Sequence, residues 1–175
     1  MAVGNLEFIK SASVSSSVSS FSVDNCFSNN YDVYAVVLQG FGLTGTTSIS
    51  LGIRFIDSGG NVISASEYDT ASLRLRSDSA FAEDKSTAGT YINASTLIDQ
   101  SPEVSNAVIY VHNPYDSSSY TFTNGQSAGA GGGAMRGWKS IGVHKVAETI
   151  RGIAIIEVNG ARPFEIGTAT IYGVK

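Results

Sequence analysis

The sequence predicts an all-β protein: a two-sheet antiparallel β-sandwich, jelly-roll-like, with eight to ten strands and little or no helix. The 175-residue chain is 42% hydrophobic but only 15% charged, whereas soluble domains average about 25% charged residues. Ser, Thr, Gly and Asn fill the difference, and these residues suit a protein with many turns. Short segments with a period of two are separated by Gly, Asn and Pro, and no segment has a convincing helical period over ten residues. We expect one domain over residues 1–175, or an extended N-terminal arm at about residues 1–10 followed by that domain.

The first half of the chain contains an edge-strand pattern followed by a core-strand pattern. In residues 11–22, SASVSSSVSSFS, the apolar residues Ala12, Val14 and Val18 recur at even spacing, which predicts an edge strand with one weakly apolar face. The segment Val33–Leu38 is apolar without a break. That pattern predicts a central strand covered on both faces.

Residues 47–57, TSISLGIRFID, show the clearest alternation in the chain. Within this segment Ile49, Leu51, Ile53 and Phe55 occupy every second position. Because successive side chains of a strand point to opposite faces, these four residues should face one side together. The turn residues DSGGN at 57–61 follow, so we expect the chain to fold back into NVISASEY and form a hairpin.

Residues 69–105 have the least regular pattern. LRLR at 73–76 alternates and predicts a short strand, whereas SDSAFAEDKS at 77–86 fits one or two helical turns or a loop. The segment 106–114, NAVIYVHNP, predicts a strand that ends at Asn-Pro, and residues 119–126 should pair with it. Three more strands are expected in the last part of the chain, within 138–146, 149–158 and 164–175.

Residues 127–140, SAGAGGGAMRGWKS, contain five glycines and resemble a phosphate-binding loop. A phosphate loop needs Gly-Lys-Ser/Thr between a strand and a helix, so that backbone N–H groups face the phosphate. Here Trp138 separates Gly137 from Lys139, and a strand pattern follows instead of a helix. We therefore expect a pliant loop carrying Arg136, Trp138 and Lys139 that packs against a neighbouring subunit or particle surface.

Composition argues against several classes of partner. The net charge is −4 and no two basic residues are adjacent, so nucleic-acid binding is not expected. No stretch approaches the roughly 20 apolar residues that span a bilayer, so membrane insertion is not expected either. The N-terminus does not resemble a signal peptide, which predicts synthesis in the cytoplasm. The single cysteine, Cys26, cannot form an intrachain disulfide and should be a half-buried small hydrophobe.

The sequence shows no catalytic or metal-binding motif, so we expect no enzyme and no cofactor. The two histidines, His112 and His144, lack an H-x-x-x-H or C-x-x-C context and are interpreted as histidines on polar strand faces. No G-x-S-x-G elbow is present. A Ser-His-Asp hydrolase remains a third hypothesis, because a chain rich in serine can form a triad that only the fold brings together.

Aromatic residues suggest a binding surface. Tyr110, Tyr115, Tyr120, Phe122 and Trp138 are expected to cluster at the loops of one end of the sandwich. Ring faces beside Asn and Asp groups are typical of sugar-binding surfaces. The alternative is that these rings cap the sandwich or fill a subunit interface. The candidate interface or ligand loop is thus Tyr115, Tyr120, Arg136, Trp138 and Lys139.

From about Leu6 to Val174 the order of motifs resembles a group of bacteriophage virion proteins, abundant in phages of aquatic bacteria, that have a jelly-roll-like β-sandwich. The resemblance rests on the tyrosine-containing strand YDVY at 31–34, the hairpin pattern IRFIDSGG at 53–60, the strand VIYVHNP at 108–114 and the ending GTATIYGV at 167–174. Each motif by itself has low specificity for this group, and the order in which the motifs occur makes the set more specific.

The resemblance implies a non-enzymatic structural protein of the virion, in a tail fibre, head fibre, baseplate or capsid-decorating role. Its partners would be other copies of itself, with a trimer as the first expectation, and other virion proteins. Because the domain fills the chain from end to end, we expect no separate shaft or anchoring arm. The alternative is a module that binds a host receptor or surface glycan around Tyr110, Tyr115 and Trp138.

Overall fold

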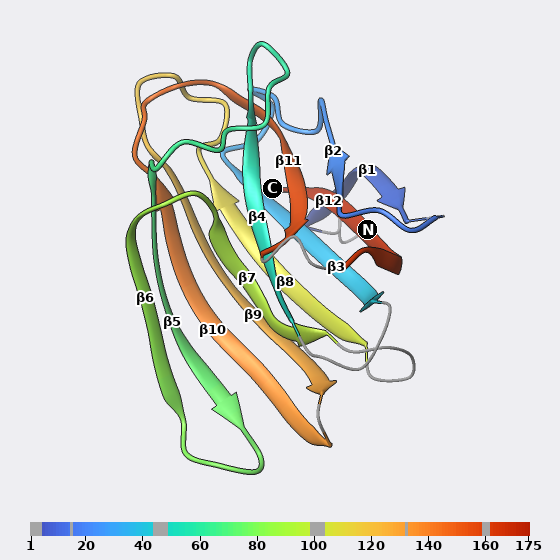
Figure 1. Ribbon diagram of the computed structural model, residues 1–175. Helices are drawn as coiled ribbons and strands as arrows, with labels where there is room; N and C mark the ends of the chain where they lie inside the picture. Colours follow the sequence, from blue (N-terminus) through green and yellow to red (C-terminus); the bar gives the residue numbers. More distant parts are fainter. Residues whose placement is uncertain (1–4, 15, 44–48, 99–103, 132, 159–161) are drawn as a thin grey trace.

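The computed structural model describes residues 5–14, 16–43, 49–98, 104–131, 133–158 and 162–175, and these residues form two antiparallel β-sheets (Figure 1). The large sheet has the strand order β1 (Leu6–Ser13), β12 (Phe164–Val174), β3 (Val33–Leu43), β8 (Ser105–His112), β9 (Thr121–Gly131), β10 (Ala134–His144), β5 (Tyr68–Arg76) and β6 (Ala82–Gly89). The small sheet has the order β2 (Ser20–Val23), β11 (Ile150–Glu157), β4 (Ile49–Asp57) and β7 (Ile92–Ile98). The all-β sandwich is confirmed, and the described residues form twelve strands in place of the expected eight to ten. No helix capable of crossing a bilayer occurs in the described ranges.

The strand order is that of a jelly roll extended by two hairpins. Without β5, β6, β9 and β10, the sheets read β1-β12-β3-β8 and β2-β11-β4-β7. In these eight strands the chain passes from one sheet to the other at each step except between β4 and β7, which is the double Greek key of a jelly roll. The hairpins β5–β6 and β9–β10 are added beside β8 and widen the large sheet.

The core lies between the two sheets and follows the period-two patterns of the sequence. Leu51, Ile53 and Phe55 of β4 are at most 1% exposed, as the alternation predicts. Strand β3 is central, as predicted, and its Tyr34 is fully buried. Its cover on the other face is incomplete, because Val37 remains partly exposed and no second layer lies there.

The serine-rich segment is not one edge strand but parts of two. Strand β1 contains Ala12 and lies at the edge of the large sheet, paired with β12. Strand β2 begins at Ser20 and lies at the edge of the small sheet, paired with β11. The segment between them crosses from sheet to sheet. Residues 6–10 therefore belong to a paired strand rather than to an extended arm; residues 1–4 lie outside the described part of the chain.

The expected hairpin after β4 is wrong, although its turn is present. The turn closes through the carboxylate of Asp57, whose Oδ1 accepts a hydrogen bond from the backbone N–H of Asn61 at 2.9 Å. The returning segment then makes one isolated bridge, between Ile56 and Val62, and leaves for the large sheet as β5. The partners of β4 are instead β11 and β7. Tyr68 explains the crossing, because its ring is fully buried against Phe55 in the core between the sheets.

The irregular segment 69–105, where it is described, consists mainly of strands joined by bends. LRLR is the end of β5, as predicted. The helical interpretation of SDSAFAEDKS is wrong: residues 77–80 form a bend and residues 82–89 form β6. Strand β6 pairs with β5, and most of its side chains are exposed, so its sequence carries no apolar periodicity from which it could have been predicted.

The glycine-rich segment is not a pliant loop but two long strands. Residues 127–131 continue β9, and β10 begins at Ala134, directly after Gly133, which has a φ of 78°. Gly137 permits close strand contact, because a Cβ atom there would lie 2.5 Å from the backbone oxygen of Ser127. Glycines at these positions allow neighbouring backbones to approach each other closely. From the sequence alone, such glycines cannot be told apart from glycines of a flexible loop.

Candidate functional site

One face of the large sheet is turned away from the small sheet and carries exposed apolar side chains; we call it the outer face. On β5, β10, β9 and β8 these are Leu73, Met135, Ile141, Phe122 and Tyr110, with exposed fractions of 38%, 68%, 62%, 49% and 38%. They alternate along each strand with the buried residues of the inner face. Monomeric proteins seldom expose neighbouring apolar side chains in such number, so this surface is a candidate for binding.

The outer face has two open hollows in which rings and amides lie side by side. The first, of about 770 Å³, is lined by Tyr110, Asn124, Gln126 and Lys139, among others. The second, of about 860 Å³, lies toward β6 and includes Phe122 and Ile141. Asn124 borders both hollows, and its Oδ1 lies 2.6 Å from Nε2 of His112. Apolar rings beside a few fixed polar groups are the usual composition of a ligand site.

The structure separates the aromatic residues that we expected to cluster. Tyr115 and Tyr120 are 41% and 46% exposed and lie in the turn between β8 and β9. Tyr110 and Phe122 are on the adjoining outer face. Trp138 is only 4% exposed, on the inner face opposite Ser127. It lies six residues along β10 from His144 at the turn end, which is about 20 Å at the rise of a strand.

The charged members of the predicted loop are also split between the two faces. Successive residues of a strand alternate, so Lys139 is exposed on the outer face while Arg136 is half-buried on the inner face. The candidate ligand loop of Tyr115, Tyr120, Arg136, Trp138 and Lys139 is therefore not one site. It was wrong because the glycine-rich segment is paired strand, and pairing forces this alternation.

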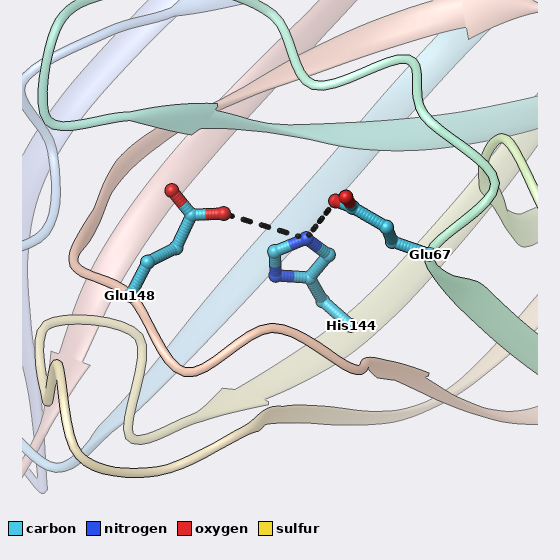
Figure 2. Close-up of side chains that lie close together, drawn as sticks. All are labelled: Glu67, His144 and Glu148. Atoms are coloured by element: carbon cyan, nitrogen blue, oxygen red, sulfur yellow. Dashed lines mark hydrogen bonds and ion pairs between the residues drawn. The ribbon is translucent and has the colours of Figure 1, made fainter.

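A second cluster was missed by sequence analysis and joins Glu67, His144 and Glu148 (Figure 2). His144 is the last residue of β10, Glu67 precedes β5, and Glu148 lies in the segment before β11. Nε2 of His144 lies 3.2 Å from Oε2 of Glu67 and 3.6 Å from Oε1 of Glu148. The spacing of His144 and Glu148 was a weak local signal; Glu67 is 77 residues away from the histidine.

His144 is not the polar-face histidine that we expected. Its side chain is fully buried, with its ring centroid 5.0 Å from that of Tyr68 and 6.0 Å from that of Phe55. Its Nδ1 has no hydrogen-bond partner among the described residues. His112 does lie on the outer face, where its ring meets the amide of Asn124. In the described part of the chain, the partners of the two histidines are carboxylates and an amide, not serine hydroxyls.

In this cluster the acidic groups outnumber the basic groups. Partial burial raises the pKa of Glu148, and the nearby charges of Asp57 and Glu67 raise it further, against the lowering effect of His144. The nearest basic residue in sequence, Lys145, forms an ion pair with Asp69 at 2.7 Å. The cluster thus brings two carboxylates to one imidazole.

The thiol of Cys26 behaves as an inert core group. It is 2% exposed, more deeply buried than predicted, and its Sγ donates a hydrogen bond to the backbone oxygen of Val23 at 3.1 Å. Burial raises the pKa of this thiol to about 12. A thiol with such a pKa is almost fully protonated at neutral pH and is a poor nucleophile.

Comparison with known proteins identifies no family for this fold. No protein family matches the sequence, and no curated protein matches it. Among solved structures, the chain has weak similarity to the CBM2 module of the evolved Dit of Lactobacillus casei BL23 phage J-1, with 10% sequence identity and a TM-score of 0.26. The match covers 89% of this chain and 68% of that one. A TM-score this low establishes neither family membership nor function, so the chain is characterised by its own structure: a two-sheet antiparallel β-sandwich with an apolar outer face and a buried histidine–glutamate cluster.

Proposed function

We propose that this chain is a non-enzymatic structural component of a bacteriophage virion, in a tail fibre, head fibre, baseplate or capsid-decorating role, and that it assembles as a homo-oligomer. The observation that carries the proposal is the apolar outer face of the large sheet. Leu73, Phe122 and Ile141 lie on neighbouring strands and are 38%, 49% and 62% exposed. Contact with another protein would remove this surface from water, at roughly 25 cal/mol for each Å² of apolar area.

Three further properties support an assembly role. The sequence motifs resemble those of phage virion proteins, as described above. The jelly roll itself is a fold that capsid proteins use. The edge strands β1, β6, β2 and β7 each have one side without a strand partner in the described sheets. Such sides, and a surface that contacts its own copy, are the features from which symmetric particles assemble.

The first test is the oligomeric state of the untagged chain and its association with particles. Light scattering coupled to size exclusion should give an oligomer, with a trimer as the first expectation, and the protein should sediment with virions. Ile141→Glu should dissociate the oligomer, because it places a charge in the apolar face. Val62→Glu is the matched control, since Val62 is 41% exposed but lies in the crossing segment outside the sheets. A monomer that never joins particles contradicts the proposal.

A second candidate function is recognition of a host-surface glycan by the first hollow of the outer face. The observation that favours it is Tyr110 beside Asn124 and Gln126, where a ring can stack on a sugar and amides can bond its hydroxyls. A glycan array should then show binding that Tyr110→Ala removes. Tyr115→Ala is the matched control, because Tyr115 is similarly exposed at 41% but lies in the turn after β8. Absence of glycan binding by the assembled protein eliminates this candidate.

A further inference from the structure

We propose that Glu67, His144 and Glu148 bind one divalent transition-metal ion of the Zn²⁺ type. The three residues come from three separate segments, which precede β5, end β10 and precede β11. Figure 2 shows the two carboxylates approaching the imidazole from opposite sides, with the dashed contacts meeting at the same ring nitrogen. Neutral imidazole and carboxylate are established ligands of zinc.

The separations of the ligand atoms fit a tetrahedral ion. Zinc lies about 2.1 Å from nitrogen and oxygen ligands, so two ligands of a tetrahedral site are about 3.4 Å apart. The two separations from Nε2 of His144 are 3.2 Å and 3.6 Å. One donor atom from each of the three residues lies within 4.8 Å of the others. An ion can thus be placed between the three groups with only small side-chain movements.

Charge balance also favours a divalent cation over a proton. An imidazolium would supply one positive charge to two carboxylates, whereas a divalent ion with a neutral imidazole supplies two. The ion pairs that the described residues make with Glu67 and Glu148 both go to His144, and Lys145 is engaged with Asp69. A partly buried pair of carboxylates without a second cation is costly, and a bound ion removes that cost.

The surroundings hold the imidazole in place and leave one side accessible to solvent. Tyr68 and Phe55 pack against the fully buried ring and fix its orientation. The side chains of Glu67 and Glu148 are 35% and 32% exposed, which provides a path for the ion and room for water as a fourth ligand. Because Nδ1 has no hydrogen-bond partner among the described residues, packing takes the role that a second hydrogen bond has in most zinc sites.

Metal binding would link the end of β10 to the segments that precede β5 and β11. The backbone N–H of Lys145 already donates to the oxygen of Glu67 at 2.9 Å, so the segments of Glu67 and His144 are in register without the ion. A preformed site of this kind binds without refolding. An ion that binds only the native state, at a free concentration one hundred times its Kd, shifts the unfolding equilibrium about a hundredfold toward the folded protein.

The test uses the untagged full chain, stripped with EDTA and titrated with Zn²⁺ at pH 7.5. Calorimetry should give one site per chain, and the Tm should rise with Zn²⁺ but not with Mg²⁺ or Ca²⁺. Co²⁺ should show the intense visible absorption of a tetrahedral complex. Glu67→Gln and Glu148→Gln should each weaken Zn²⁺ binding more than about tenfold, since each removes a charged ligand.

His112→Gln is the matched control, because His112 lies on the outer face with Asn124 and should leave the affinity unchanged. His144→Gln should abolish binding, and the two glutamate variants decide the matter if that buried substitution prevents folding. No binding of Zn²⁺ or Co²⁺ by the stripped, folded chain overturns the proposal. Binding that persists undiminished in Glu67→Gln and Glu148→Gln also overturns it, because the ion then lies elsewhere.

Discussion

Replacing Tyr68 by phenylalanine tests why the chain leaves β4 for the other sheet instead of forming a hairpin. The ring of Tyr68 is fully buried, and its hydroxyl makes two hydrogen bonds to the neighbouring layer. It accepts one from the backbone N–H of Phe55 at 3.1 Å and donates one to the backbone oxygen of Ile63 at 3.2 Å. The hydroxyl therefore links β5, β4 and the crossing segment. Tyr68→Phe keeps the ring and removes both hydrogen bonds.

The expected loss of stability follows from the groups left behind. A buried N–H without a partner costs about 1–3 kcal/mol, and Phe55 is in the core with 0% exposure. We therefore expect the free energy of unfolding to fall by about 1–3 kcal/mol. For a chain of 150–250 residues, about 1 kcal/mol lowers the Tm by roughly 2–4 °C, so the Tm should fall by about 2–12 °C.

Urea unfolding followed by circular dichroism measures this change directly. The midpoint should shift without a change in slope, since Tyr68→Phe exposes no additional surface in the folded state. Tyr115→Phe is the control: this tyrosine is 41% exposed, and its substitution should stay within about 0.5 kcal/mol. If Tyr68→Phe changes stability no more than the control does, the hydroxyl does not hold the crossing segment and the explanation given for the missing hairpin fails.

Three other predictions concern the packing of β10 and the core. Gly137→Ala should destabilise the fold by about 1–3 kcal/mol in urea unfolding, because the added Cβ would lie 2.5 Å from the backbone oxygen of Ser127. If the variant is as stable as the wild type, the interpretation of this segment as a loop is restored. Trp138, the single tryptophan of the chain, is 4% exposed, so its fluorescence should be blue-shifted and resist quenching by acrylamide. Emission typical of a water-exposed tryptophan would contradict the alternation along β10. The Cys26 thiol should react with a disulfide reagent at pH 8 about a thousandfold more slowly in the native chain than in denaturant, because burial raises its pKa from 9.0 to about 12. This raised pKa stabilises the folded state below pH 9, and the stabilisation is lost at higher pH, where the thiol of the unfolded chain ionises. Equal reaction rates of the thiol in the native and the denatured chain would refute its burial.

The proposals and the predictions depend on different parts of the molecule, so they can fail separately. The assembly proposal depends on the outer face of the large sheet, and Ile141→Glu tests it there. The metal proposal depends on the end of the sandwich where Glu67, His144 and Glu148 meet. Failure of one leaves the other standing, because Ile141 is exposed on the outer face whereas His144 is fully buried.

Strand patterning was readable from the sequence wherever a strand has one buried and one exposed face. Leu51, Ile53 and Phe55 occupy alternate positions of β4 and are all in the core. The pairing of β8 with β9 was also predictable, because a strong strand, an Asn-Pro stop and a second strand follow one another closely. In both cases the signal is local, and burial of one face converts it directly into structure.

Three features were decided by tertiary structure alone. The destination of the chain after Asp57 depends on the buried Tyr68, whose partners lie on another strand. The glycines of β9 and β10 are paired because neighbouring backbones approach closely, as Gly137 and Ser127 do. Strand β6 has no apolar period because most of its side chains remain exposed. Each of these features depends on residues outside the segment concerned, so the local sequence pattern of that segment does not predict it.

By itself, the sequence determined the class of the fold, since a period of two can bury its apolar residues only between sheets. It did not determine which side chains meet. Trp138 and Lys139 are adjacent in sequence yet lie on opposite faces of the sheet, whereas Glu67 and His144 are 77 residues apart and lie 3.2 Å apart. Strand geometry separates sequence neighbours, and the pairing of β5 with β10 brings Glu67 and His144 together at the end of the sandwich.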